Sequence, residues 1–319
     1  MGKYLIRRVL ISIPTLLVIS FVIFAIIALA PGDPLSQFAA NPAVPPEVRA
    51  NIRHSLGLDQ PWPVRYVKWL WSLLHGDLGY SFASRIPVME LIKQRLPNTL
   101  SVLGVSYVLS VIFAIPIGVL SAIRRYTLFD HLTTAFAFVG FSVPTFFSGV
   151  LLIIIFSIKL HWFPFIYDST LTVHNFPTLI AQIKQSIMPI TVLMLFQTAT
   201  LVRYVRAEML ENLPQDYVRT AWAKGLRPAI VVGRHVLRNS LIPVITLVAL
   251  GVPSVFAGAV ITEQIFRVPG IGDLLIRSIE NSDTPVVVAV TFIYAFLVVV
   301  FNLIADLLYG IVDPRIRYS

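Results

Sequence analysis

The chain has 319 residues, of which 56% are hydrophobic and 13% charged, with a mean hydropathy of +0.80 and a formal net charge of +9. This composition excludes an ordinary water-soluble domain, because a chain of this length cannot bury so much apolar surface in its own core. The sequence contains no cysteine, which excludes disulfides, thiolate metal sites and thiol catalysis.

Six apolar segments are long enough to cross the ~30 Å hydrocarbon core of a membrane. They are residues 9–30, 99–123, 132–158, 186–202, 241–262 and 285–305, and the fourth is the shortest. The first resembles a signal peptide, but its apolar run exceeds the ~7–15 residues of such a segment, so we interpret it as an uncleaved span. The sequence therefore predicts an all-α integral membrane protein with six transmembrane helices.

Basic residues predict which segments face the cytoplasm. With the N-terminus inside, the inside segments hold 14 Lys and Arg, and the short outside segments hold 4. Because cytoplasmic loops carry such an excess, we expect a multi-pass protein with both termini in the cytoplasm. The same bias explains the net charge without nucleic acid as a partner.

This topology leaves a large extracytoplasmic loop after the first span. We therefore divide the chain into 1–98, the first span plus this loop, and 99–319, a five-helix core. Residues 31–34, PGDP, predict a sharp turn. Trp62, Tyr66, Trp69 and Trp71, with cations between them, favour a helix in the headgroup layer. That helix would anchor the bundle, and docking of an external partner is the alternative.

A second outside loop, residues 263–284, holds four acidic and two basic residues. Pro269 and Gly270, followed by Gly272, require a tight turn, after which residues 273–279 predict a short amphipathic helix. Together with Glu263, these residues are a candidate outer gate of a pathway. A simple lid on the bundle is the alternative, and the sequence does not separate the two.

A basic cytoplasmic loop, residues 206–240, joins the fourth and fifth spans. Asp216 can cap a short helix, Gly225 can end it at positive φ, and Pro228 suits the first turn of a second helix that runs to about residue 239. Pro243 then marks the entry to the fifth span. Small residues such as Ala221 on one face would let the first helix enter a groove of a partner protein. An ordinary basic loop is the alternative.

Short sequence motifs along the whole chain resemble those of the permease subunits of ABC importers, in the dipeptide, oligopeptide and nickel transport family. Residues 217–243 resemble that family's cytoplasmic loop, in which an alanine, three residues and a glycine precede a basic helix ending at a proline. The other matching strings are APGDP at 30–34, LGLDQP at 56–61, HGDLGYSF at 75–82, RLPNTL at 95–100, IGVLSAIRR at 117–125, VPGIGDLL at 268–275 and DLLYGIVDPRIR at 306–317.

The resemblance implies a permease subunit of an ATP-driven, binding-protein-dependent importer, forming half of the translocation pathway for peptides or related small solutes. It also implies that the chain lies in the cytoplasmic (inner) membrane of a prokaryote. The implied partners are membrane lipid, a homologous second permease, two ATP-binding subunits and an extracytoplasmic substrate-binding protein. A coupling helix would be seated on an ATPase subunit. Its implied residues are Arg219, Thr220, Ala221, Lys224, Gly225 and Leu226.

This chain departs from the general form of the motif at two positions. Arg219 and Thr220 stand where glutamate and alanine are common, a departure that is usual in the peptide branch. Arg227 and Pro228 also shorten the linker between the two helices.

The sequence has no GxxxxGK[ST] string. We therefore expect no ATPase site, no catalytic residue, no metal site and no cofactor in this subunit, with ATP bound by its partners. A stand-alone secondary transporter or channel would predict intramembrane charges or inverted repeats, and an intramembrane enzyme would predict a catalytic group at depth. Only the matching sequence motifs argue against a structural membrane scaffold. The sequence does not choose among dipeptide, oligopeptide, nickel, glutathione or another substrate.

Overall fold

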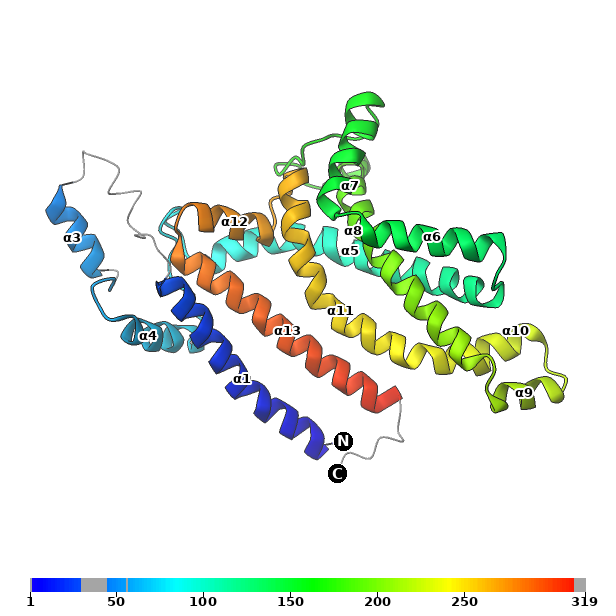
Figure 1. Cartoon of the computed structure of the whole chain (residues 1–319). Coiled ribbons are helices and arrows are strands. Elements are labelled where there is room, and N and C mark those ends of the chain that lie inside the picture. Colours follow the sequence, from blue (N-terminus) through cyan, green and yellow to red (C-terminus); the bar gives the residue numbers. More distant parts are fainter. Residues whose placement is uncertain (1, 30–44, 56, 313–319) are drawn as a thin grey trace.

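The computed structural model describes residues 2–29, 45–55 and 57–312. Within these ranges the chain is helical, with one isolated bridge between Tyr80 and Pro87 and no β-strand. The long helices lie side by side in an elongated bundle (Figure 1). The all-α prediction is confirmed, whereas the turn predicted at 31–34 lies outside the described residues.

The helices follow one another along the whole described chain. They are α1 (Gly2–Leu29), α3 (Pro46–Ser55), α4 (Trp62–Leu74), α5 (Val88–Ile123), α6 (Leu128–Ser142), α7 (Thr145–Leu152), the π-helix η1 (Ile153–Lys159), α8 (Phe176–Asn212), α9 (Asp216–Ala223), α10 (Pro228–Ile230), the π-helix η2 (Val231–Val236), α11 (Leu237–Phe266), α12 (Ile271–Glu280) and α13 (Thr284–Val312).

Five helical segments in the described ranges are long and apolar enough to cross a membrane. They are Ile6–Leu29, Val88–Ile123, Phe176–Asn212, Pro228–Pro253 and Thr284–Leu308. The fourth predicted span, the shortest in the sequence, is the middle of the 37-residue α8.

The third predicted span is not one straight helix. Leu128–Ser142 and Thr145–Lys159 meet at an angle of 102°. Pro144 lacks a backbone N–H and disfavours the α conformation at the preceding residue. Val143 accordingly has φ −87° and ψ 120°, an extended backbone. The apolar run of 132–158 therefore folds as a broken pair, α6 followed by α7 and η1.

The boundary predicted near residue 239 is wrong. Helical residues continue from Pro228 through η2 into α11, which ends at Phe266 and contains Pro243 in its interior. Prolines are tolerated inside membrane helices where neighbouring groups satisfy the freed carbonyl. The second helix of the cytoplasmic loop is therefore the beginning of the fifth span.

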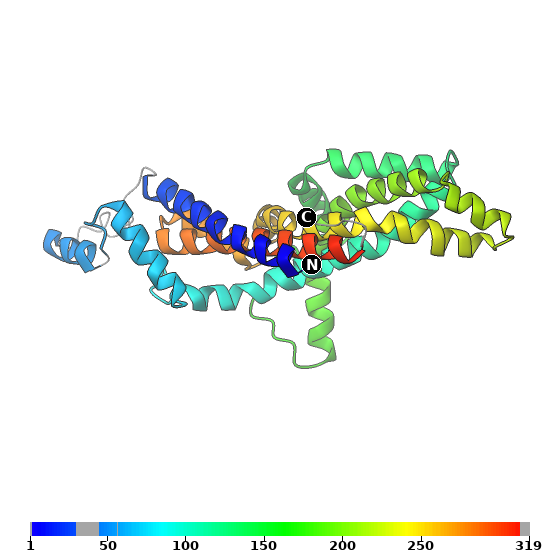
Figure 2. The ribbon, with the colours of Figure 1, turned by 90° about the horizontal axis from the view of Figure 1, so that it is seen from below.

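The centre of the bundle is the pair α5 and α8, which make the most extensive helix contact. A Cβ on Gly118 of α5 would lie 2.7 Å from Val205 Cβ on α8. A glycine there lets the two backbones approach closely, as small residues do at helix contacts in membranes. α11 packs on α8 and α13, and α13 packs on α1, so the helices form one continuous bundle (Figure 2).

The aromatic helix α4 packs against α1 and does not lie alone. The Tyr66 ring is 5.3 Å from that of Phe21, and the Trp69 ring is 5.7 Å from that of Phe24. Tyr66 also shares a 2.9 Å hydrogen bond with Ser20. Tyr66 and Trp69 thus face α1, whereas Trp71 is 67% exposed. Both the anchor and the docking interpretations of this helix stay predictions.

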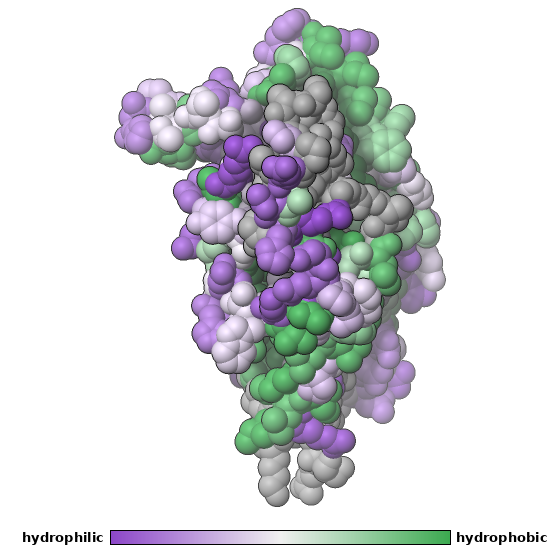
Figure 3. All heavy atoms as spheres, turned by 90° about the vertical axis from the view of Figure 1, so that its left-hand side faces the viewer, coloured by the Kyte–Doolittle hydropathy of each residue, from purple (hydrophilic) through white to green (hydrophobic). Residues whose placement is uncertain are grey.

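Figure 3 views the bundle from the side on which α3 and α4 lie nearest the viewer. Hydrophilic side chains gather in the middle of this face, and hydrophobic side chains dominate its lower part. This face therefore combines a polar region with an apolar one.

The close approach of α5 and α8 predicts the effect of adding one methyl group. Gly118→Ala should lower the midpoint of thermal unfolding in detergent, because overpacking costs ~1–3 kcal/mol. Gly104→Ala on the same helix is the matched control, since no described atom lies within 4 Å of its Cβ position. The control should unfold at or slightly above the wild-type temperature. Wild-type stability in Gly118→Ala would contradict a packing role for this glycine.

Candidate functional site

A short helical hairpin joins α8 to α11. Three residues separate α9 from α8, and α9 ends at Ala223. Gly225, two residues later, has a φ of +72°. The Leu226 N–H donates to Ala221 O at 3.4 Å, and the Gly225 N–H donates to Trp222 O at 2.9 Å. These two bonds form a Schellman motif, which needs a left-handed residue at the position of Gly225. The predicted helix stop is confirmed.

The inner face of α9 is part of the chain's own core. Val218 and Ala221 are 1% and 4% exposed. They share a hydrophobic cluster with Met209 of α8, Val231 of η2 and Ala122 of α5. Ala221 therefore seats α9 on the bundle, which differs from the expectation that it lies on a partner-facing surface. A small residue permits close approach here, but the neighbour is this chain.

The outer face of α9 holds the remaining residues of the predicted coupling helix. Arg219, Thr220, Lys224 and Gly225 are exposed, and Leu226 is half-buried. Arg219 pairs with Asp216 at 3.5 Å, but a pair this exposed contributes little to stability.

The structure adds an aromatic residue that the sequence analysis did not select. Trp222 is 47% exposed on the hairpin, which protrudes at one end of the bundle (Figure 1). Its signal in the sequence was a tryptophan in a basic loop between two spans. An exposed tryptophan among cations fits a surface that binds another protein.

At the opposite end of α11, Glu263 caps the N-terminus of α12. Its Oε2 accepts hydrogen bonds from the Gly272 N–H at 2.8 Å and the Asp273 N–H at 3.1 Å. Its Oε1 accepts one from the Thr99 hydroxyl at 2.7 Å, and Thr99 Oγ1 accepts one from the Ile271 N–H at 2.7 Å. A carboxylate there satisfies free N–H groups and interacts favourably with the helix dipole.

The glycines of the candidate gate are explained by their distance to this carboxylate. A Cβ on Gly270 would lie 2.1 Å from Glu263 Oε1, and one on Gly272 would lie 2.9 Å from Glu263 Oε2 and 2.6 Å from Val260 Cα. The Pro269 carbonyl accepts a 3.1 Å hydrogen bond from the Asn98 side chain. The structure thus brings the four predicted gate residues together.

Glu263 is 1% exposed and follows the last residue of the predicted span 241–262. Burial raises the pKa of its carboxyl, and the hydrogen bonds from Thr99 and from the N–H groups of Gly272 and Asp273 oppose that rise.

Two further buried carboxylates at this end were missed. Asp273 accepts from Arg277 Nε at 2.9 Å and pairs with Arg95 at 3.4 Å. Asp283 accepts from the Phe82 N–H at 2.9 Å, so it attaches residues of the predicted 1–98 unit to the 99–319 core. The sequence showed only a net acidic loop, because burial depends on which segments meet.

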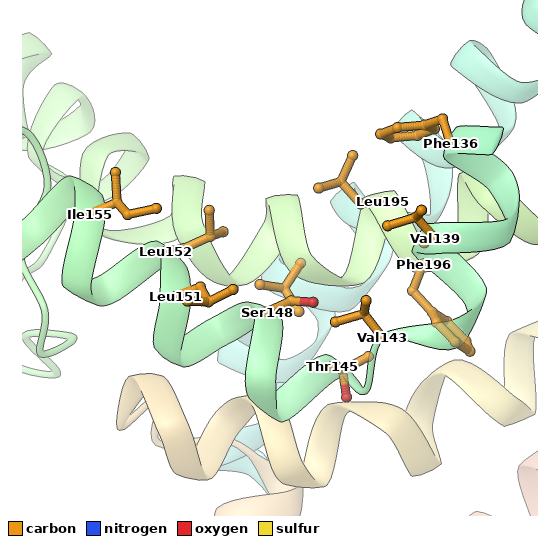
Figure 4. A pocket seen from close by; sticks show the side chains of 12 residues that line it. Phe136, Val139, Val143, Thr145, Ser148, Leu151, Leu152, Ile155, Leu195 and Phe196 are labelled. Carbon is orange, nitrogen blue, oxygen red and sulfur yellow. The ribbon is translucent and has the colours of Figure 1, made fainter. Parts of the chain in front are cut away.

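An apolar pocket of about 310 Å³ lies between α6, α7 and α8, beside the 102° bend (Figure 4). Phe136, Val139, Ser148 and Phe196 are among its lining residues. Such a lining fits hydrocarbon and offers no group that would hold phosphates. Among the described residues, no three His, Asp or Glu side chains gather as a candidate metal site.

The Glu263 cap predicts a stability difference between two glutamates. Glu263→Gln should lower the thermal unfolding midpoint, because the amide has one acceptor oxygen for three donors and leaving a buried group unpaired costs ~1–3 kcal/mol. Glu280→Gln, in the exposed last turn of α12, is the matched control and should behave like wild type. Equal midpoints for both variants would show that the cap does not hold α12.

Comparison with known proteins identifies the family. Residues 114–318 match the model of the binding-protein-dependent transport system inner membrane component, and residues 1–103 match the model of the N-terminal part of such components. The chain is 45% identical over 319 residues, all of both chains, to the oligopeptide transport system permease protein AppB of Bacillus subtilis (strain 168). It is 37% identical over 340 residues, again all of both, to the dipeptide transport system permease protein DppB of Escherichia coli (strain K12).

A solved structure shows the same fold. An inward-facing form of the MetNI methionine ABC transporter matches with a TM-score of 0.54 at 17% identity, covering 70% of this chain and 97% of that one. The chain therefore belongs to the family of binding-protein-dependent transport system inner membrane components, as a multi-pass permease subunit of an ABC importer that works with an ATP-binding subunit and a substrate-binding protein.

Proposed function

We propose that this chain forms half of the translocation pathway of an importer for peptides or related small solutes. The observation that carries the proposal is the protruding hairpin, which is continuous with α8 on one side and begins the α10–η2–α11 helix on the other. The oligopeptide and dipeptide permeases named above support peptides as the substrate class. Family membership favours this function over a stand-alone secondary transporter or channel.

The exposed face of the hairpin would contact an ATP-binding subunit. Arg219, Thr220 and Lys224 offer polar contacts there, and Trp222 adds an apolar one. Ala221 and Leu226 contribute differently, by seating α9 on the bundle. A displacement of the hairpin then reaches α8 and α11 directly and moves them as rigid bodies.

ATP would be bound and hydrolysed entirely by the partner subunits, and this chain would hold no cofactor. A homologous second permease would form the other half of the pathway, above two ATP-binding subunits and below an external substrate-binding protein. We place both termini in the cytoplasm. The 3.3 Å pair between Arg8 of α1 and Asp306 of α13 supports one side for both ends.

At the outer end, the α11–α12 corner is our candidate gate. Glu263, Pro269, Gly270 and Gly272 are joined closely enough that α12 would move together with the end of α11. A rocking motion of α11 would therefore open or close the outer mouth through this corner.

The subunit composition tests the proposed function directly. The tagged chain, extracted from its native membrane in mild detergent, should carry with it two ATP-binding subunits, a second six-span permease and an external substrate-binding protein. The ligand retained by that binding protein would identify the substrate class. Recovery of the chain alone, or only with copies of itself, would refute the proposal.

The coupling role predicts the effect of a branched side chain at Gly225. Gly225→Val should reduce uptake by at least about tenfold while ATP hydrolysis continues, because a β-branched residue at positive φ distorts the hairpin. Gly76→Val is the matched control, since Gly76 has φ +81° and, like Gly225, no described atom within 4 Å of its Cβ position. Its uptake should stay near wild type. Normal uptake in Gly225→Val would exclude the hairpin as the coupling element.

A further inference from the structure

A buried ion pair joins the α5–α6 turn to α8. Asp130, in the first turn of α6, is 2% exposed. Its two oxygens accept hydrogen bonds from Arg206 Nε at 2.7 Å and Arg206 Nη2 at 2.8 Å, a bidentate arrangement. The Ser121 hydroxyl and the Tyr126 N–H, the latter at 3.0 Å, also donate to this carboxylate. Because a buried carboxylate without its partner is costly, this contact strongly resists separation.

The clamp, defined as Asp130 with Arg206, attaches to α8 where the hairpin is seated. Arg206 lies between Val205 and Met209, and both of these pack in the cluster that holds Val218 of α9. The same cluster contains Ala122, at the end of α5. The hairpin, the end of α8 and the α5–α6 turn are therefore neighbours, and both ribbon views place them at one end of the molecule (Figures 1 and 2).

α6 differs from the other long helices in what it contacts. Its main helix contacts are with α8 and α5, whereas α8 and α11 continue directly into the hairpin. Farther along α6, Gly140 lies against Ala199 Cβ of α8, and the Arg203 guanidinium of α8 lies over the rings of Phe138 and Phe141, 5.3 and 5.7 Å from their centroids. Cation–π contacts at this range fix position less tightly than a bidentate ion pair, which sets both distance and orientation. The clamp is thus the strongest directional link between α6 and α8 near the hairpin.

α6 leads to the broken helix pair. Its last residue, Ser142, precedes the 102° bend, and the apolar pocket lies beside this bend (Figure 4). A displacement of α6 that α7 does not share would change the bend and the shape of the pocket.

We propose that Asp130 and Arg206 are positioning residues that make α6 move together with α8, so that movement of the hairpin reaches the α6–α7 bend. This inference rests on the proposed coupling role of the hairpin. Without the clamp, α8 and α11 still move with the hairpin, but α6 is displaced less than they are.

The functional test compares Asp130→Asn and Arg206→Lys with wild type in the complete transporter. Solute taken up per ATP hydrolysed should fall about five- to tenfold in each, and the double variant should be no worse than either single one, since the two residues act as a unit. Asp306→Asn, which removes the more exposed inter-helix pair with Arg8, is the matched control and should keep the wild-type ratio. Ser121→Ala, which removes one hydrogen bond to Asp130, should give a smaller loss in a fully folded protein.

A distance measurement separates a positioning role from a general loss of stability. Because the chain has no cysteine, spin labels can be placed at Leu132 of α6 and Glu211 of α8, both exposed. Wild type should show one narrow distance that is the same with and without bound nucleotide. Arg206→Lys should show a broadened distance that changes with nucleotide.

Two results would overturn the inference: a wild-type distance that changes with nucleotide, or clamp variants with wild-type distances and coupling. If Gly225→Val uncouples the transporter and Arg206→Lys does not, only this inference fails. If no ATP-binding subunit co-purifies with wild type, the proposed function fails first.

Discussion

The close contact between α5 and α8 is the constraint on which the rest of the structure depends. Gly118 allows α5 to approach Val205 of α8, and α8 in turn supports α6, α7 and α11. The next residues of α8 carry Arg206 of the clamp and Met209 of the hairpin core. In a membrane, apolar surfaces gain little by leaving lipid for each other, so fit between helices decides how they pack.

Polar contacts then fix the two ends of the bundle. At one end, Asp130 joins the α5–α6 turn to α8. At the other, Glu263 and Asp283 attach α12 and residues 81–83 to the ends of the long helices. Carboxylates are costly to bury unless they are paired, and each of these accepts several hydrogen bonds. The helices pack through apolar side chains in the middle of the bundle and are joined by hydrogen bonds and ion pairs at its two ends. We therefore expect each helix to move as a rigid body.

The sequence did not predict which prolines interrupt a helix. Pro116 and Pro189 lie inside the continuous helices α5 and α8, and Pro243 lies inside α11. Pro144 instead coincides with the break between α6 and α7. All four remove one backbone donor, but whether the helix continues depends on neighbouring groups that only the packed bundle supplies.

The sequence by itself determined the membrane class, the number and approximate position of the apolar spans, the helix stop at Gly225 and the turn at Gly270, because these follow from composition, length and local backbone preferences. The tertiary structure alone decided that Ala221 faces inward, that Trp222 faces outward and that Asp130 meets Arg206. Those facts depend on which helix faces lie against each other. Segments as far apart as Thr99 and Glu263 must meet before their contact exists, and no local pattern encodes that meeting.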